Sequence, residues 1–129
     1  MGATSFTDFV EGVNAQEAFE TAIGAARWEN GLGGYTGTIA EKHRFVLIRE
    51  SVADVRAQLV KYAAVSFTEQ SRALHIEALD KADTPRAKAL AIARALIALQ
   101  DGRVEDKWGP AGCIPVEGQL YLFFGMASQ

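Results

Sequence analysis

Two short segments of the sequence combine the residue types that bind anions and aromatic rings. Residues 35–42 contain two threonines and a lysine after a glycine-rich stretch, and residues 106–110 contain a lysine and a tryptophan. Lysine neutralises anions, threonine hydroxyls hydrogen-bond to them, and aromatic side chains stack on rings. If the two segments converge, the sequence predicts a site for a small anionic, nucleotide-like ligand. Its candidate residues are Tyr35, Thr36, Thr38, Glu41, Lys42, Asp106, Lys107 and Trp108.

Both segments also have a purely structural interpretation. Four glycines within residues 31–37 favour a loop whose exposed N–H groups are of the kind that binds phosphate. However, the segment lacks the Gly-Lys-Ser/Thr ending of a P-loop, and we expect a strand after it instead of a helix. The structural alternative is an entry into a β-hairpin, with Tyr35 packed on the sheet and with Trp108 and Pro110 closing the edge of the core.

A cysteine nucleophile is the second chemistry that the sequence offers. Cys113, His43 and several acids allow a Cys/His/Asp arrangement to be drawn, and residues 101–106 form an acidic stretch. Cys113 lies beside an expected apolar strand, which favours a buried structural role. Two distant histidines and one cysteine match none of the usual metal-ligand spacings, so we expect no metal and no cofactor.

Composition predicts one globular domain over residues 1–129. The chain is 49% hydrophobic and 22% charged, with a single cysteine, which favours a reducing cytoplasm and one core without disulfides. No secretory signal pattern is present, and the apolar stretch at 87–99 is too short and too interrupted for a membrane span. Because no dense cluster of Lys and Arg occurs, generic nucleic-acid binding is not expected.

Negative charge is concentrated near the start of the sequence, although the net charge is only −3. The first 30 residues contain one base, Arg27, and five acids, which are Asp8, Glu11, Glu17, Glu20 and Glu29. Such a distribution can present a negative face to a basic protein, and a solvated helix surface explains it equally well.

The expected strands lie at both ends of the sequence and near residue 45. Residues 3–10 favour a strand, and residues 112–116 and 119–126 predict a hairpin that turns at Glu117-Gly118. Residues 35–41 and 44–49 predict a second hairpin that turns at Lys42-His43, with residues 45–48 as a buried central strand.

Four helices are expected from their capping residues and apolar periodicity. Asn14 with Glu17, and Ser51 with Asp54, have the spacing of capping boxes, and Tyr62 is expected on the apolar face of the second helix. Thr68 and Thr84-Pro85 predict the starts of two more helices, the last of which is the likeliest core helix because residues 89–99 are apolar on most sides.

These elements predict an α+β fold. In it, an antiparallel sheet formed by the N- and C-terminal segments packs against an N-terminal helix and about three central helices. The apolar segment from Leu120 to Phe124 is a candidate edge strand, and pairing of that edge across a two-fold axis leaves a homo-oligomer open.

Three segments also occur together in a recognisable pattern: GGYTGTIAEK at residues 33–42, DKWGPAGC at 106–113 and YLFFG at 121–125. As a set they resemble small bacteriophage and mobile-element proteins that have no assigned activity. In those proteins tryptophan often stands where this chain has Met126. The resemblance implies an accessory protein in the host cytoplasm that acts on a host system.

Two functions from different classes follow from these observations. The first is a non-catalytic accessory or host-interaction protein that binds a host protein or a small anionic, nucleotide-like ligand. The alternative is a small enzyme that acts on a nucleotide-like substrate through Cys113 or the acidic stretch at 101–106.

Overall fold

A four-stranded sheet forms the centre of the molecule in the computed structural model, which describes residues 2–31, 33–61 and 68–129. The strands are β1 (Ala3–Glu11), β2 (Phe45–Leu47), β3 (Ala111–Glu117) and β4 (Leu120–Ser128), and their order across the sheet is β1-β4-β3-β2. β4 pairs antiparallel with both β1 and β3, whereas β2 runs parallel to β3. The α+β class and the pairing of the two ends of the chain are therefore confirmed, and the sheet is mixed.

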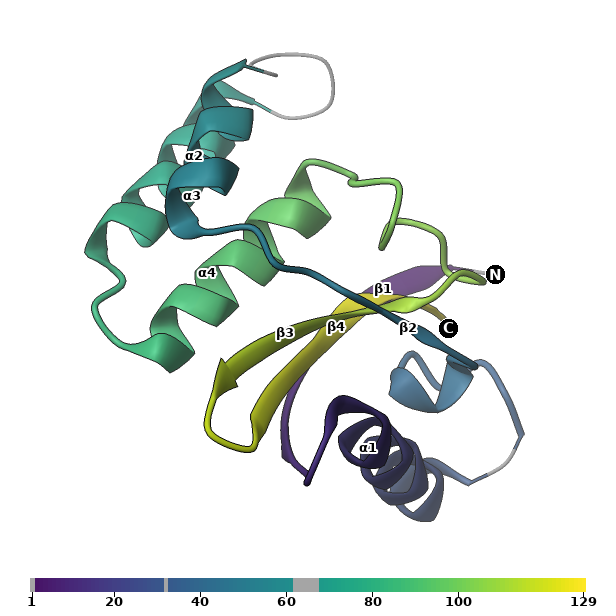
Figure 1. The fold of residues 1–129 in the computed structure, drawn as a ribbon. Helices are drawn as coiled ribbons and strands as arrows, with labels where there is room; N and C mark the ends of the chain where they lie inside the picture. Colours follow the sequence, from purple (N-terminus) through teal and green to yellow (C-terminus); the bar gives the residue numbers. More distant parts are fainter. Residues whose placement is uncertain (1, 32, 62–67) are drawn as a thin grey trace.

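Helices cover both faces of this sheet (Figure 1). α1 (Ala15–Asn30) lies on one face together with the short 3-10 helix η1 (Ile39–Glu41), and α4 (Pro85–Ala98) lies on the other. α2 (Val52–Lys61) and α3 (Glu69–Lys81) pack on α4 and on each other, on the side of α4 away from the sheet. No helix in the described residues is long and apolar enough to cross a membrane.

Side-chain caps start the four α-helices at the residues that the sequence predicts. Asn14 Oδ1 accepts a hydrogen bond from the amide of Glu17 at 2.8 Å before α1. Ser51 and Asp54 exchange two hydrogen bonds before α2, each between the side chain of one residue and the amide of the other. The same capping precedes α3 and α4, where it is provided by Thr68 and Thr84. Tyr62, expected on α2, lies outside the described residues.

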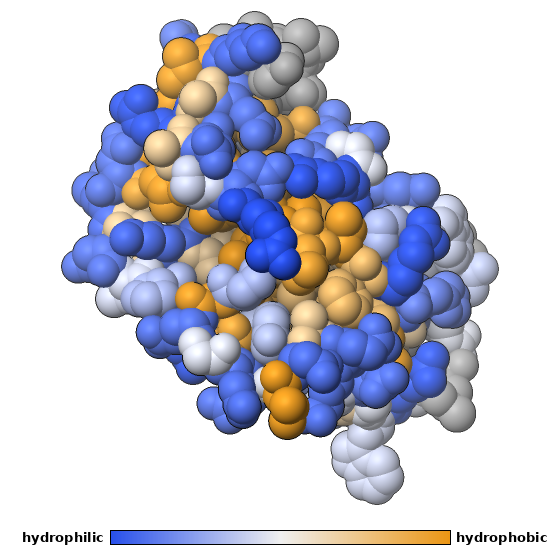
Figure 2. Space-filling model, in the orientation of Figure 1, coloured by the Kyte–Doolittle hydropathy of each residue, from blue (hydrophilic) through white to orange (hydrophobic). Residues whose placement is uncertain are grey.

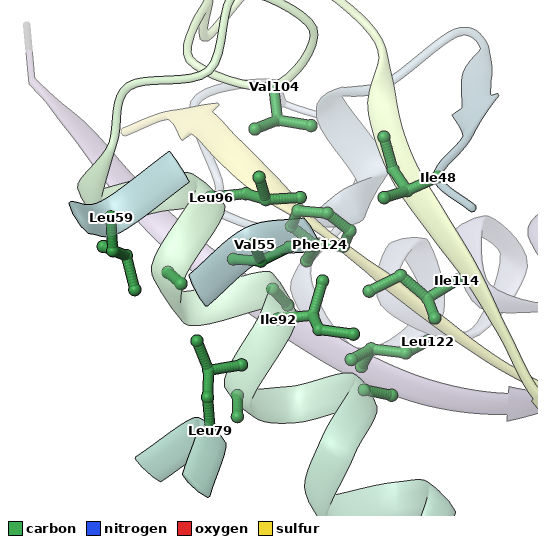
Figure 3. Packing of buried hydrophobic residues seen from close by; sticks show 14 residues of the cluster. Ile48, Val55, Leu59, Leu79, Ile92, Leu96, Val104, Ile114, Leu122 and Phe124 are labelled. Carbon is green, nitrogen blue, oxygen red and sulfur yellow. The ribbon is translucent and has the colours of Figure 1, made fainter. Parts of the chain in front are cut away.

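The sheet separates two hydrophobic cores. On the α4 face, Phe124 of β4 packs with Leu96 of α4, which confirms α4 as the core helix (Figure 3). On the α1 face, the rings of Phe19, Phe45 and Phe123 form a cluster in which the centroid distances are 5.1, 5.6 and 5.8 Å. β4 is buried on both faces because Phe123 and Phe124 are consecutive and point to opposite sides.

The predicted hairpin of residues 35–41 and 44–49 is wrong. Tyr35, Gly34 and Gly37 have positive φ angles, which no regular strand allows, and Thr38 caps the 3-10 helix η1. Residues 45–47 then form β2, which pairs in parallel with β3 at the edge of the sheet and is not a buried central strand. An apolar run of four residues cannot by itself distinguish a central strand from a short edge strand.

The interpretation of residues 120–124 as an edge strand is also wrong, because β4 lies between β1 and β3. Its main-chain groups are used on both sides, and a dimer through this strand is excluded. The two edges of the sheet are β1 and β2. On the face drawn in Figure 2, hydrophobic side chains gather near the centre of the view, with hydrophilic side chains around them.

Candidate functional site

The two predicted loop segments converge in the structure. The rings of Tyr35 and Trp108 meet edge to face, with their centroids 6.1 Å apart, although 73 positions separate the two residues in the sequence. The side chains remain 49% and 58% exposed, so the contact lies at the surface. Lys107 Nζ lies 5.5 Å from the centroid of the Trp108 ring, within the range of a cation–π contact. These three residues form what we call the aromatic surface.

Lys42 joins the two loops from inside the protein. Its side chain is buried, and Nζ donates hydrogen bonds to the carbonyl oxygens of Asp106 at 3.2 Å, Lys107 at 3.3 Å and Gly109 at 3.0 Å. Burial lowers the pKa of Lys42 to about 8; the negative charge of Asp106 opposes this shift and the positive charge of Arg44 adds to it. Because an ammonium group has three protons, these carbonyls occupy all of its donors.

A second network fixes the glycine-rich loop. Glu41 Oε2 accepts hydrogen bonds from the amide of Thr36 at 3.2 Å and from the Thr36 hydroxyl at 2.7 Å, and that hydroxyl lies 2.7 Å from the hydroxyl of Thr38. Burial raises the pKa of Glu41, but hydrogen bonds from Thr36 and from the backbone of Tyr35 outweigh this effect and leave the pKa below its ordinary value. The Ser128 hydroxyl is buried and has no hydrogen-bond partner of good geometry among the described residues.

Gly37 attaches this loop to the sheet. Its amide donates to the carbonyl of Ser128 at 2.8 Å, and its φ angle is +70°. A Cβ atom at this position would lie 2.8 Å from Cγ2 of Thr4 in β1. Both the positive φ angle and the close approach require glycine here. The loop that carries Tyr35 is therefore hydrogen-bonded to β4 and lies close to β1.

The connector between α4 and β3 is held by its own acids. Asp101 accepts hydrogen bonds from the guanidinium of Arg103, which keeps the pKa of this carboxyl below its usual range despite burial. Arg103 also pairs with Glu50 at 2.7 Å. Asp106 Oδ1 accepts a hydrogen bond from the amide of Trp108 at 2.9 Å and so shapes the turn that presents the indole ring.

The eight predicted site residues thus separate into an outer and an inner group. Tyr35, Lys107 and Trp108 lie at the surface, so neither Tyr35 packed on the sheet nor Trp108 in the core is observed. The hydroxyls of Thr36 and Thr38 and the carboxylate of Glu41 bond to one another, and Lys42 bonds to the loop that contains Asp106. In this geometry Lys42 has no proton for a ligand, so its expected contact with an anion finds no support.

Cysteine chemistry has little support in the geometry. Cys113 lies in β3 with no exposed surface, and burial raises the pKa of its thiol to about 12. The nucleophilic thiolate is therefore almost absent at neutral pH. His43 is exposed in the loop between η1 and β2. Among residues 2–31, 33–61 and 68–129, no three His, Cys, Asp or Glu side chains lie close enough together to hold a metal ion.

Sequence reasoning misses the partners of Lys42 because they are backbone carbonyls. A carbonyl carries no side-chain signature, and only the Gly109-Pro110 turn signals that the chain bends here.

Comparisons with protein-family models, with curated proteins and with solved structures found no match for this chain.

Proposed function

We propose that this protein is a non-catalytic accessory protein of bacteriophage type that binds a protein of the host through the aromatic surface. The observation that carries the proposal is the exposed edge-to-face pair of Tyr35 and Trp108, supplied by two loops that are far apart in sequence. Tyrosine and tryptophan are enriched among the residues that dominate the free energy of protein–protein binding.

The rigidity of the supporting loops adds to this proposal. Lys42 holds three carbonyls of the Trp108 loop, while Glu41 and Gly37 hold the Tyr35 loop. An aromatic pair that is already fixed loses little conformational entropy when a partner covers it. Leaving two aromatic rings half exposed keeps apolar area in water, which association with a partner would remove.

A small anionic, nucleotide-like ligand is the second candidate. The cation–π contact of Lys107 with Trp108 favours it, because a base or sugar ring can stack beside a positive charge in such a place. A protein partner is preferred because small-molecule sites are concave and bury most of the ligand. The described pocket nearest to Tyr35, lined by residues such as Gly34 and Glu41, has a volume of about 170 Å³, smaller than usual ligand pockets.

The experiment compares proteins captured from a bacterial host by wild-type protein, Trp108→Ala, Tyr35→Ala and Trp28→Ala. Trp28 is a matched control because it is 90% exposed on α1 and is not part of the aromatic surface. We expect one host protein to be retained by wild type and Trp28→Ala and lost by the other two variants. Equal capture by all four contradicts the proposal, and a small co-purifying mass that Trp108→Ala loses in native mass spectrometry favours the ligand alternative.

A further inference from the structure

Strand β1 has a free edge. It pairs with β4 alone, and two hydrogen bonds continue this ladder at its ends, from the Gly12 amide to the Gln119 carbonyl and from the Gln129 amide to the Gly2 carbonyl. Because bonded residues alternate along an antiparallel pair, the even-numbered residues of β1 direct their main-chain groups to β4. The main-chain groups of Ser5, Thr7 and Phe9 therefore point away from the sheet, and no described residue bonds to them.

Two grooves run along this edge, one on each face of the sheet. The groove on the α1 face has a volume of about 260 Å³, and its walls include Asp8, Ala22, Ala26 and Glu29. Small alanine side chains on α1 leave the space that a larger residue would fill. The groove on the α4 face has a volume of about 360 Å³, and its walls include Thr7, His75, Arg94 and Ile97.

The grooves carry charges of opposite sign. In the α1-side groove, burial and the nearby charge of Glu29 raise the pKa of Asp8. In the α4-side groove, burial and the nearby charge of Arg94 lower the pKa of His75. Outside this groove, the guanidinium of Arg86 lies 5.1 Å from the centroid of the Phe9 ring. No base forms a salt bridge with Asp8 or Glu29 in the described chain. A basic side chain placed in the α1-side groove would offset the charges of Asp8 and Glu29, and an acidic side chain placed in the α4-side groove would offset the charge of Arg94.

An added strand would fit both the free edge of β1 and the two charged grooves beside it. An extended segment satisfies free main-chain donors and acceptors, and its side chains alternate between the two faces of the sheet. We propose that β1 binds an extended segment of a partner protein in which basic and acidic residues alternate. The basic side chains lie in the groove with Asp8 and Glu29, and the acidic side chains lie beside Arg94 and His75.

A second copy of this chain is a poorer occupant of the edge. In the antiparallel pairing of β1 with β1 about a two-fold axis, each face of one sheet continues into the same face of the other. The acidic grooves would then adjoin, and so would the basic ones, and directly opposed like charges destabilise strand pairs. The charge pattern thus favours a different partner whose sequence complements it.

This inference is independent of the aromatic surface, because other residues carry it. The probe is a fluorescein-labelled nine-residue peptide that alternates Lys and Glu, and the control peptide has the same composition with the lysines and glutamates in two blocks. Fluorescence anisotropy with the protein of residues 1–129 measures both dissociation constants. We expect the alternating peptide to bind at least about 10-fold more tightly than the block peptide. Equal binding, or no saturable binding up to about 1 mM, overturns the proposal.

Charge-neutral variants of the protein test the acidic groove. Asp8→Asn with Glu29→Gln should weaken binding of the alternating peptide by at least about 10-fold. The matched control is Glu20→Gln with Glu117→Gln, which removes the same charge at exposed positions outside both grooves. The control should change the dissociation constant by less than about 2-fold. Equal weakening by both double variants means attraction by net charge alone and contradicts a groove.

N-methylated peptides test strand addition itself. In an antiparallel addition, the peptide amides that bond to β1 belong to residues whose side chains lie on the same face as that of Thr7, which are the glutamates. In a parallel addition they belong to the lysines. One peptide is therefore methylated at the amides of all its glutamates, and a second at the amides of all its lysines. Only one of these two peptides should lose binding. Loss in both or in neither overturns strand addition, and a peptide-sensitive dimer in sedimentation would identify a second copy as the occupant instead.

Discussion

The buried ammonium of Lys42 gives the sharpest prediction about stability. Substitution of Lys42 by Met keeps the length of the side chain and removes the three hydrogen bonds to the carbonyls of the 106–109 loop. A buried carbonyl left without a donor destabilises the fold by about 1–3 kcal/mol. These carbonyls lie close to the surface, so we take about 1–2 kcal/mol for each of them. The loss of all three hydrogen bonds then destabilises the fold by roughly 3–6 kcal/mol.

A gain of opposite sign partly offsets this loss. Burial lowers the pKa of Lys42 from 10.5 to about 8, which corresponds to roughly 3 kcal/mol of destabilisation of the charged form in the folded protein. Methionine avoids that penalty. The net effect of Lys42→Met on the free energy of unfolding at pH 7 should be a loss of no more than about 3 kcal/mol, measured by denaturant titration.

The pH dependence of this difference isolates the lysine. Between pH 8 and 10.5 the unfolded chain keeps the proton on residue 42 and the folded chain releases it, so the free energy of unfolding of the wild type rises with pH. Lys42→Met lacks this group, while all other titrations cancel between the two proteins. The deficit of Lys42→Met should therefore grow by about 3 kcal/mol between pH 7 and pH 10.5.

The control for this experiment is Lys88→Met, because Lys88 is exposed on α4. Its difference from the wild type should stay flat over the same pH range. A deficit of Lys42→Met that stays constant or shrinks with rising pH would refute the reasoning. It would mean that the three carbonyls stabilise the ammonium more than burial destabilises it.

Three further predictions concern other parts of the fold. The carboxylate of Glu41 has a lowered pKa, so its contribution to stability is present above pH 4.5 and is lost below it; Glu41→Gln should flatten the acid branch of a stability–pH curve. Gly112→Ala would place a Cβ atom 2.5 Å from Cζ of Phe124, and denaturant titration should show a loss of about 1–3 kcal/mol. The thiol of Cys113 should react with an aromatic disulfide only as fast as the protein opens, and prompt labelling in native buffer would contradict its buried position.

The starts of the helices could be predicted from the sequence because their causes are local. A cap involves a side chain and an amide three residues away, so Asn14, Ser51, Thr68 and Thr84 identify four helix starts without any knowledge of the fold. The C-terminal hairpin is local in the same sense, since its two strands are separated only by the turn at Gly118. Fold class follows from these elements.

The place of β2 could not be predicted, because strand pairing is not local. Residues 45–47 find their partner 66 positions later in β3, and nothing in their own sequence indicates that partner. The sequence predicts that the segment before them pairs with them, because a short turn at Lys42-His43 can join the two segments. The positive φ angles at Gly34, Tyr35 and Gly37 show why that pairing fails.

The candidate site was predicted as a set of residues, but the direction of each side chain was not. Thr36, Glu41 and Lys42 have the chemistry to contact a ligand, and the same chemistry satisfies backbone and side-chain groups inside the loops. Which of the two occurs depends on whether a second loop covers them. For Lys42 the 106–109 loop does so, and its carbonyl oxygens accept the hydrogen bonds that an anion is expected to accept.

This arrangement favours a protein partner over a ligand that carries phosphate. A ligand that carries phosphate needs exposed donors, whereas the donors of Thr36 and Lys42 already have acceptors in the protein. The aromatic surface offers apolar area, edge-to-face geometry and one cation over a ring, which suit the centre of a protein interface. If a host protein is captured there, loosening the support should weaken its binding even though no contact is removed. Lys42→Met should therefore reduce capture while Tyr35 and Trp108 are both present, whereas Lys88→Met should not, because a surface that must first be ordered binds less tightly.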